Sequence, residues 1–205
     1  MAYPKHKKAL AGARADLKHG VREHPLGSNT NGRVRVMQSH TWLGGTGWPW
    51  CVAAWVTWAE EAGFILPYQG AGAYAFGDWA RRAGWTCKLA DAIPGDGIVL
   101  RIGAGHMGLL EDYFPVSGKL TTIDGNSSHR VKRNTYHRSQ VYAVVHVPEK
   151  PAVLPKAKPP LFEVVTSESG HKVIYVSTAS RVGKRLPKIL QKYAKVTVRR
   201  RKRKP

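Results

Sequence analysis

The stretch Gly-Trp-Pro-Trp-Cys-Val-Ala-Ala-Trp-Val-Thr-Trp-Ala-Glu-Glu-Ala-Gly, from Gly47 to Gly63, constrains the fold of this 205-residue chain more than any other. Its apolar residues recur at helical spacing, which predicts a helix over about 51–62 with one apolar face. Pro49 disfavours helical backbone at the residue before it, so the helix should begin just after this turn. Cys51 would then occupy the first turn, where unpaired N–H groups favour a thiolate. The stretch therefore presents a candidate nucleophile.

Two later segments carry groups that could serve this cysteine. His106 opens an apolar run over 106–113, and Asp124 and Asn126 end the next run, over 120–126. If the two runs pair as antiparallel strands, the end of the second lies beside His106. An imidazole can exchange a proton with the thiol, and a polar group can orient the imidazole. We favour Asp124 as that group, with Asn126 as the alternative or as support.

Each of these signals also has a purely structural explanation. A cysteine at a helix start is often a small buried apolar residue, and Ile-Asp-Gly-Asn is an ordinary hairpin turn. Their joint occurrence, in the order cysteine, histidine, Asp/Asn, favours nucleophilic catalysis.

Helical patterns precede strand patterns along the first 147 residues. Helices are predicted over 9–18, 33–43, 51–62 and 73–82, and strands over 98–100, 106–113, 120–126, 135–137 and 141–147. Helices followed by an antiparallel meander predict an α+β domain over 1–147.

The remainder of the chain has a different composition. Residues 148–160 are proline-rich and predict a stiff linker, and 161–205 predict a small basic β-rich module with strands over 162–166 and 173–177. Residues 150–205 hold 16 basic and 2 acidic side chains, a net charge of +14, whereas 1–149 hold 17 and 11, a net charge of +6. Such a segment suits anionic cell-wall polymers or nucleic acid, unless it is a solvated extension without function. A Lys/Arg run over 199–204 is predicted to be disordered.

Cysteine and histidine usage gives no sign of a disulfide framework or a metal site. The two cysteines are too few for a framework, and Cys87 is expected to be a structural thiol. His129, His137 and His146 lack ligand spacing and a partnering carboxylate cluster, so no metal is expected.

The first 20 residues lack the apolar run of a signal peptide, and no segment approaches the roughly 20 apolar residues of a membrane span. We therefore expect synthesis in the cytoplasm without a leader.

Four motifs, in this order, resemble the CHAP domain (cysteine, histidine-dependent amidohydrolase/peptidase). They are Gly-x-Pro-Trp-Cys-x-x-x-x-Val-x-Trp, Pro-Gly-Asp-Gly-Ile-Val-Leu, Gly-His-Met-Gly-Leu-Leu and Ile-Asp-Gly-Asn. The upstream Gly-Val-Arg-Glu-x-Pro-x-Gly-Ser-Asn resembles the entry segment of phage and bacterial members. The resemblance covers about residues 20–147 and says nothing about 150–205.

The resemblance implies a papain-like (NlpC/P60-type) fold, with the nucleophile's helix packed on an antiparallel sheet, and hydrolysis of an amide bond in peptidoglycan. By position, Cys51 becomes the nucleophile and His106 the general base and then acid. Asp124 stands where many members carry Glu, with Asn126 two residues on. No metal or organic cofactor is implied.

We expect a phage-lysin role for the chain, as a monomer, and the absence of a leader fits release through a membrane lesion or transport on a virion. The cut bond, amidase-type or endopeptidase-type, is left open. Glu23, Asn29, Trp48 and Trp50 are candidates for contacting substrate, with bracing or core packing as the alternative. The alternative function is a basic nucleic-acid-binding or virion structural protein with an inactive CHAP-like domain.

Overall fold

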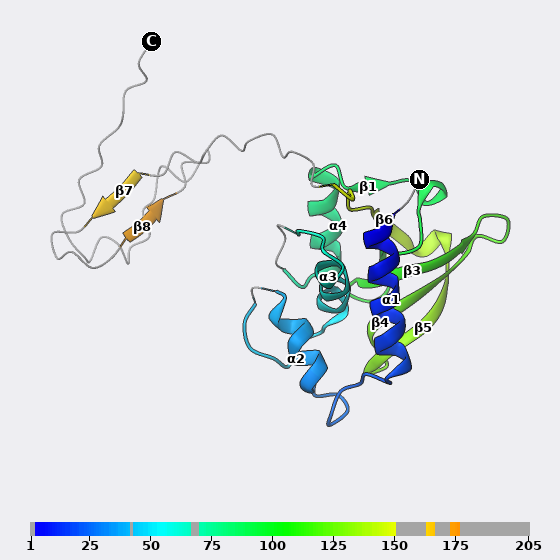
Figure 1. Ribbon diagram of the computed structural model, residues 1–205, viewed down its shortest axis with the longest axis horizontal. Coiled ribbons are helices and arrows are strands. Elements are labelled where there is room, and N and C mark those ends of the chain that lie inside the picture. The colour runs from blue at the N-terminus through cyan, green and yellow to red at the C-terminus, as the bar shows by residue number, and fades with distance from the viewer. Residues whose placement is uncertain (1–2, 42, 67–69, 151–162, 167–172, 177–205) are drawn as a thin grey trace, which may run out of the picture. The chain divides into compact units, whose positions relative to one another are not determined.

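The computed structural model describes residues 3–41, 43–66, 70–150, 163–166 and 173–176 (Figure 1). The chain divides into two compact units, 1–151 and 152–205.

In the first unit, helices precede a single antiparallel sheet. The helices are α1 (Pro4–Lys18), α2 (Gly32–Ser39), α3 (Cys51–Glu61) and α4 (Ala73–Arg82). The strands are β1 (Thr86–Cys87), β2 (Gly97–Leu100), β3 (His106–Phe114), β4 (Lys119–Ser127), β5 (Arg130–His137) and β6 (Val141–Val145), in the order β1-β6-β2-β3-β4-β5. The predicted α+β class is confirmed. Strands β2 to β5 form a meander, and β6 returns to pair with β2 on its other side.

The sequence located most elements but misplaced some ends. Helix α2 ends at Ser39, before the predicted end at residue 43. Near this end, the Ser39 hydroxyl donates to the Val36 carbonyl and the Thr41 hydroxyl donates to the Gln38 carbonyl. Strand β1 was not predicted. The first half of β5 was also missed, because its residues are mostly polar and it forms an exposed edge of the sheet.

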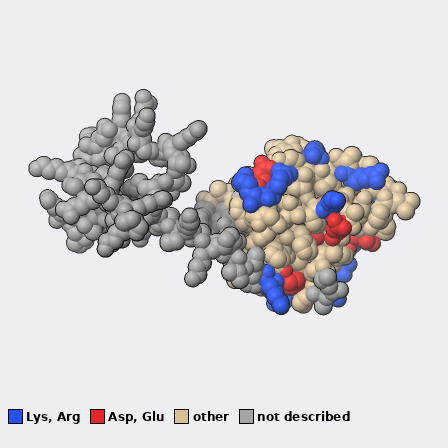
Figure 2. Space-filling model, turned by 90° about the horizontal axis from the view of Figure 1, so that it is seen from above, with Lys and Arg blue, Asp and Glu red and all other residues tan. Residues whose placement is uncertain are grey.

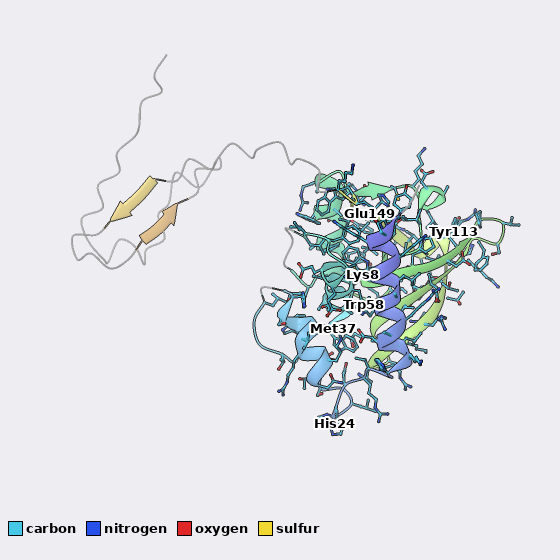
Figure 3. The ribbon with its side chains drawn as sticks, in the orientation of Figure 1. Lys8, His24, Met37, Trp58, Tyr113 and Glu149 are labelled. Carbon is cyan, nitrogen blue, oxygen red and sulfur yellow. The ribbon has the colours of Figure 1, made fainter. Side chains whose placement is uncertain are left out.

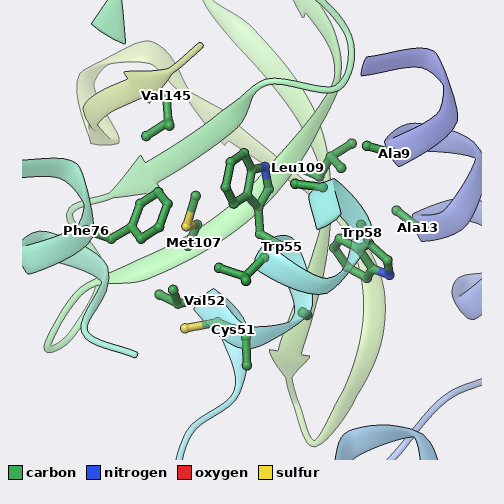
Figure 4. Close-up of a cluster of buried hydrophobic side chains, with 14 of the residues drawn as sticks. Ala9, Ala13, Cys51, Val52, Trp55, Trp58, Phe76, Met107, Leu109 and Val145 are labelled. Carbon is green, nitrogen blue, oxygen red and sulfur yellow. The ribbon is translucent and has the colours of Figure 1, made fainter. Parts of the chain in front are cut away.

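Helix α3 is the centre of the unit. Every residue from Cys51 to Ala59 is buried, so the prediction of a single apolar face was wrong. A helix that is apolar all round belongs inside a core. Figure 4 shows Trp58 directed toward Ala13 of α1, and Trp55 close to Met107 of β3. Helix α3 is surrounded by helices α1 and α2 and by strands β3 and β4.

Helix α1 starts five residues earlier than predicted because a distant carboxylate caps it. Pro4 occupies the first helical position, and Glu149 Oε1 accepts the N–H groups of Lys5 (3.0 Å) and His6 (3.2 Å). Glu149 lies beside the start of α1 (Figure 3). Residues 148–150, which the sequence assigned to the linker, thus include a residue that packs on the first unit.

A buried aspartate joins the three N-terminal helices. Asp16 of α1 accepts the indole N–H of Trp58 (2.7 Å) and two N–H groups of Arg33, and Arg33 continues to Glu61 (2.8 Å). These contacts raise the pKa of Arg33, chiefly through its hydrogen bond to Glu61, so the guanidinium stays charged.

In the second unit, β7 (Glu163–Thr166) and β8 (Val173–Val176) pair antiparallel, with Glu163 opposite Val176. These match the strands predicted over 162–166 and 173–177. Residues 151–160 of the predicted linker and the basic run over 199–204 lie outside the described residues. None of the described helices is long and apolar enough to cross a membrane.

The close approach of α3 to β4 requires a glycine and gives a testable prediction. A Cβ at Gly125 would overlap Ala54 and lie 3.0 Å from the Trp50 ring, whereas a Cβ at Gly12 would make an ordinary 3.7 Å contact with Trp58. Gly125→Ala should lower the free energy of unfolding by about 1–3 kcal/mol. Gly12→Ala, inside α1, should raise it by up to about 1 kcal/mol. Urea denaturation with equal m-values measures both, and similar effects from the two variants would contradict the packing described.

Candidate active site

Cys51 is the first residue of α3, as the sequence predicted. The first bond of the helix ladder runs from the Ala54 N–H to the Trp50 carbonyl (2.9 Å). The Cys51 amide therefore precedes the helix's own hydrogen bonds and is available to another acceptor. The cysteine is 7% exposed and is a free thiol.

His106 and Asp124 meet across a glycine. Gly108 of β3 lies opposite Asp124 of β4, and His106 is two residues from Gly108, so it shares its face of the strand. His106 Nε2 lies 3.1 Å from Asp124 Oδ2. A Cβ at Gly108 would overlap Asp124 Oδ1, so the glycine makes room for this carboxylate.

Two residues of β5 hold the same carboxylate oxygen. Asn134 Nδ2 (2.8 Å) and the Tyr136 hydroxyl (2.7 Å) both donate to Asp124 Oδ2, which thus has three partners including His106. Asp124 is fully buried, and charge-assisted hydrogen bonds of this kind are what stabilise a buried carboxylate. Sequence analysis missed Asn134 and Tyr136. The one sequence signal for these residues was the alternation of side chains along β5, a strand too polar to be recognised.

The environment favours the charged form of the His106 imidazole. Burial opposes that charge, but hydrogen bonds and charge interactions with Asp124 and with the Cys51 side chain outweigh it and raise the pKa of His106 to about 10. Because Nε2 faces Asp124, Nδ1 is left for the thiol of Cys51. Burial, together with the Asp124 carboxylate, also raises the pKa of Tyr136, so its phenol remains a donor.

Asn126 lies in a different network from His106. It adopts a left-handed backbone conformation, with φ of 55°. In the amide orientation that satisfies both its ends, it donates to Glu23 Oε1 (3.0 Å) and accepts the Trp50 N–H (3.3 Å). Asn126 therefore ties the end of β4 to the start of α3, and Asp124 is the group that contacts the imidazole.

Glu23 is the buried centre of that second network. Its carboxylate accepts the indole N–H of Trp50 (3.0 Å) and the N–H of Gly27 (2.8 Å), and lies 3.1 Å from His129 Nδ1. Burial opposes its ionisation, but hydrogen bonds from Trp50, Asn29 and Gly27 outweigh burial and lower the pKa of Glu23. Glu23 and Trp50 are buried, with 1% and 0% of each residue exposed, so they brace the site and offer substrate no surface.

Asn29 and Trp48, the other two candidates for substrate contact, are half-buried. Gln38 of α2 links them, because its Nε2 donates to the carbonyls of Asn29 (3.0 Å) and Trp48 (2.9 Å). Gln38 thus positions the loop that leads into Cys51, a role that no sequence motif signalled.

Tyr74 of α4 lies against the approach to His106. A Cβ at Gly105 would come within 3.0 Å of the Tyr74 ring, and Gly105 has φ of 102°, where L side chains are strained. The half-buried Tyr74 is therefore a further candidate for contact with a ligand at His106.

The other cysteine and histidines occupy separate environments. Burial, with Asp96 and Asp91 nearby, raises the pKa of Cys87 to about 12, so it remains a thiol at neutral pH. His137 contacts Ser139, and His129 contacts Glu23. His146 lies beside one carboxylate, Asp96, and beside His6, two partners that the sequence did not indicate. These partners lie 50 and 140 residues away in the chain, where ligand spacing gives no signal.

The charged side chains of the first unit do not form one continuous basic surface on the face shown in Figure 2. There, Lys and Arg form separate groups with acidic residues among them. Among the ion pairs of this unit, Arg14 and Arg133 both pair with Glu111.

No protein-family model, curated protein or solved structure matches this chain.

The raised pKa of His106 gives a prediction that separates Asp124 from Asn126. In the wild type, His106 should titrate near pH 10, and Asp124→Asn or Cys51→Ala should move its pKa down toward 6.5. Asn126→Gly, which keeps the backbone conformation, should leave it unchanged. Side-chain NMR of the imidazole nitrogens measures all four proteins, and a wild-type pKa near 6.5 would refute the proposed contacts.

The same shift has a consequence for stability. The folded-state pKa of His106 is raised, so the stability that its imidazolium contributes to the folded protein is fully present below pH 6.5. This stability is lost as the pH rises toward about 10. The wild type should therefore lose more stability than Asp124→Asn across this interval.

Proposed function

We propose that this chain is a cysteine-dependent peptidoglycan hydrolase that cleaves an amide bond of the bacterial cell wall. The observation that supports the proposal most strongly is the contact of His106 with both Asp124 and Cys51, which raises the pKa of His106 to about 10. A structural histidine needs no such pairing with a thiol and a buried carboxylate. The motifs that resemble the CHAP domain and the papain-like arrangement they imply add the substrate class to this chemistry.

The reaction begins from an imidazolium facing a thiolate. The raised pKa of His106 favours its charged imidazole, which can hold the proton that the Cys51 thiol gives up when it reacts. The thiolate attacks the amide carbonyl carbon and forms a C–S bond. The Cys51 backbone N–H, which the helix ladder leaves available, donates to the oxyanion.

His106 then transfers its proton to the leaving nitrogen, and the C–N bond breaks to leave a thioester on Cys51. Water attacks the thioester and gives its proton to His106, and the C–S bond then breaks to release the acid product and restore the thiolate and the imidazolium. Asp124 holds the imidazole through Nε2 in both steps, and Asn134 and Tyr136 keep the carboxylate in place. No step needs a metal or organic cofactor.

Wall clearing by purified protein tests the function. Cys51→Ala and His106→Ala should each reduce the rate of turbidity loss of purified walls by at least about a thousandfold. Cys87→Ala is the matched control, because its thiol has a raised pKa and lies outside the site, and it should clear walls at close to the wild-type rate. Mass spectrometry of the fragments assigns the cut bond. Clearing by Cys51→Ala at the wild-type rate would refute the proposed nucleophile.

The basic residues of 150–205 support a second function of the chain, retention on a polyanion. We favour anionic wall polymers, because retention there would concentrate the hydrolase on its substrate. A chain ending after Pro151 keeps Glu149 and the first unit, and it should bind walls more weakly and with less salt dependence than the full chain.

The alternative, a nucleic-acid-binding or virion protein with an inactive CHAP-like domain, rests on the same charge. It predicts that the full chain binds DNA with steep salt dependence while walls stay intact. If the shortened and full chains bind walls equally, the basic residues of 150–205 have no anchoring role on the wall.

A further inference from the structure

A second cluster of buried polar groups lies where the start of α1, the turn before β2 and the end of β6 meet. His6 comes from α1, Asp96 from the turn, and His146 directly follows β6. Asp96 and His6 are 0% and 1% exposed, and His146 is 28% exposed. The hydrolase chemistry proposed above uses none of these residues.

His6 uses one ring nitrogen to contact Glu149 and leaves the other without a hydrogen bond. His6 Nδ1 lies 2.8 Å from Glu149 Oε1, which also accepts the backbone N–H groups of Lys5 and His6. A carboxylate that receives several N–H groups is an acceptor, so Glu149 accepts the Nδ1 proton. His6 Nε2 is buried and has no hydrogen-bond partner of good geometry among the described residues.

This nitrogen faces a buried carboxylate oxygen. His6 Nε2 lies 3.2 Å from Asp96 Oδ1, and His146 Nδ1 lies 2.9 Å from the same oxygen. A buried carboxylate is stabilised when it is paired or coordinates a metal ion, and both imidazole nitrogens can be ligands of such an ion. The three ligand atoms lie within 4.8 Å of one another. Ligand atoms about 2.0–2.1 Å from a tetrahedral zinc ion are roughly 3.3 Å apart, close to the two shorter separations.

We propose that His6 Nε2, Asp96 Oδ1 and His146 Nδ1 bind a divalent transition-metal ion of the zinc type. Two imidazoles and one carboxylate suit zinc better than calcium or magnesium, which prefer oxygen ligands. Glu149 orients His6 by accepting its Nδ1 proton, as outer carboxylates do for zinc-bound histidines. Water completes the coordination on the exposed side of His146. The ion displaces the proton between His146 and Asp96 and links α1 to the sheet.

Binding of Zn²⁺ alone to the full chain tests this site. Cys51→Ala and Cys87→Ala are combined first, so that no thiol can hold the metal. This protein should bind one Zn²⁺ in calorimetry and melt at a higher temperature with Zn²⁺, but not with Ca²⁺ or Mg²⁺. Adding His146→Gln should weaken binding by about a hundredfold. Adding His137→Gln, which alters an exposed histidine outside the cluster, should leave it unchanged.

A direct readout covers the case in which His146→Gln folds poorly. In the thiol-free chain, Zn²⁺ should shift the NMR signals of His6 Nε2 and His146 Nδ1 and leave those of His137 in place. The proposal is overturned if Zn²⁺ does not bind saturably, if only exposed histidines shift, or if folded His146→Gln binds as tightly as its parent. None of these outcomes depends on wall hydrolysis.

Discussion

The burial of α3 on all sides is the constraint on which the first unit depends. Its apolar residues face helices on one side and strands β3 and β4 on the other, and Gly125 allows β4 to come within contact of Ala54 and Trp50. A helix held this way cannot rotate or slide without losing core contacts. Core packing therefore fixes the position of Cys51, the first residue of α3.

Buried carboxylates connect segments that are far apart in the chain. Glu23 ties the entry loop to Trp50 and Asn126, Asp16 joins three helices, and Asp124 gathers His106, Asn134 and Tyr136. Each receives several donors, which offsets the cost of removing its charge from water. The candidate site has two parts, the start of α3 and the shared face of β3 and β4. Different residues of these networks hold each part in place. This separation explains why Asp124 and Asn126, two residues apart, have different roles.

Much of the fold could be predicted from local pattern. Helix α4 has the predicted bounds, strands β2 and β3 differ from prediction by one residue at one end, and β4 differs by one residue at each end, because periodicity of apolar residues is a local property. The misses have a shared cause. The start of α1 depends on Glu149, and the first half of β5 is polar on an exposed edge, so neighbouring residues carry no signal for either.

Local sequence patterns were enough to place the helices before the meander strands, Cys51 at a helix start, and His106 and Asp124 on successive strands. The packing of distant segments was needed to show that Asp124 contacts the imidazole, that Asn134 and Tyr136 hold Asp124, that Glu23 and Trp50 are buried braces, and that His6, Asp96 and His146 converge. The physical reason is distance along the chain. Periodicity and capping act over a few residues, whereas a buried polar group takes its partners from whichever segments the core brings beside it.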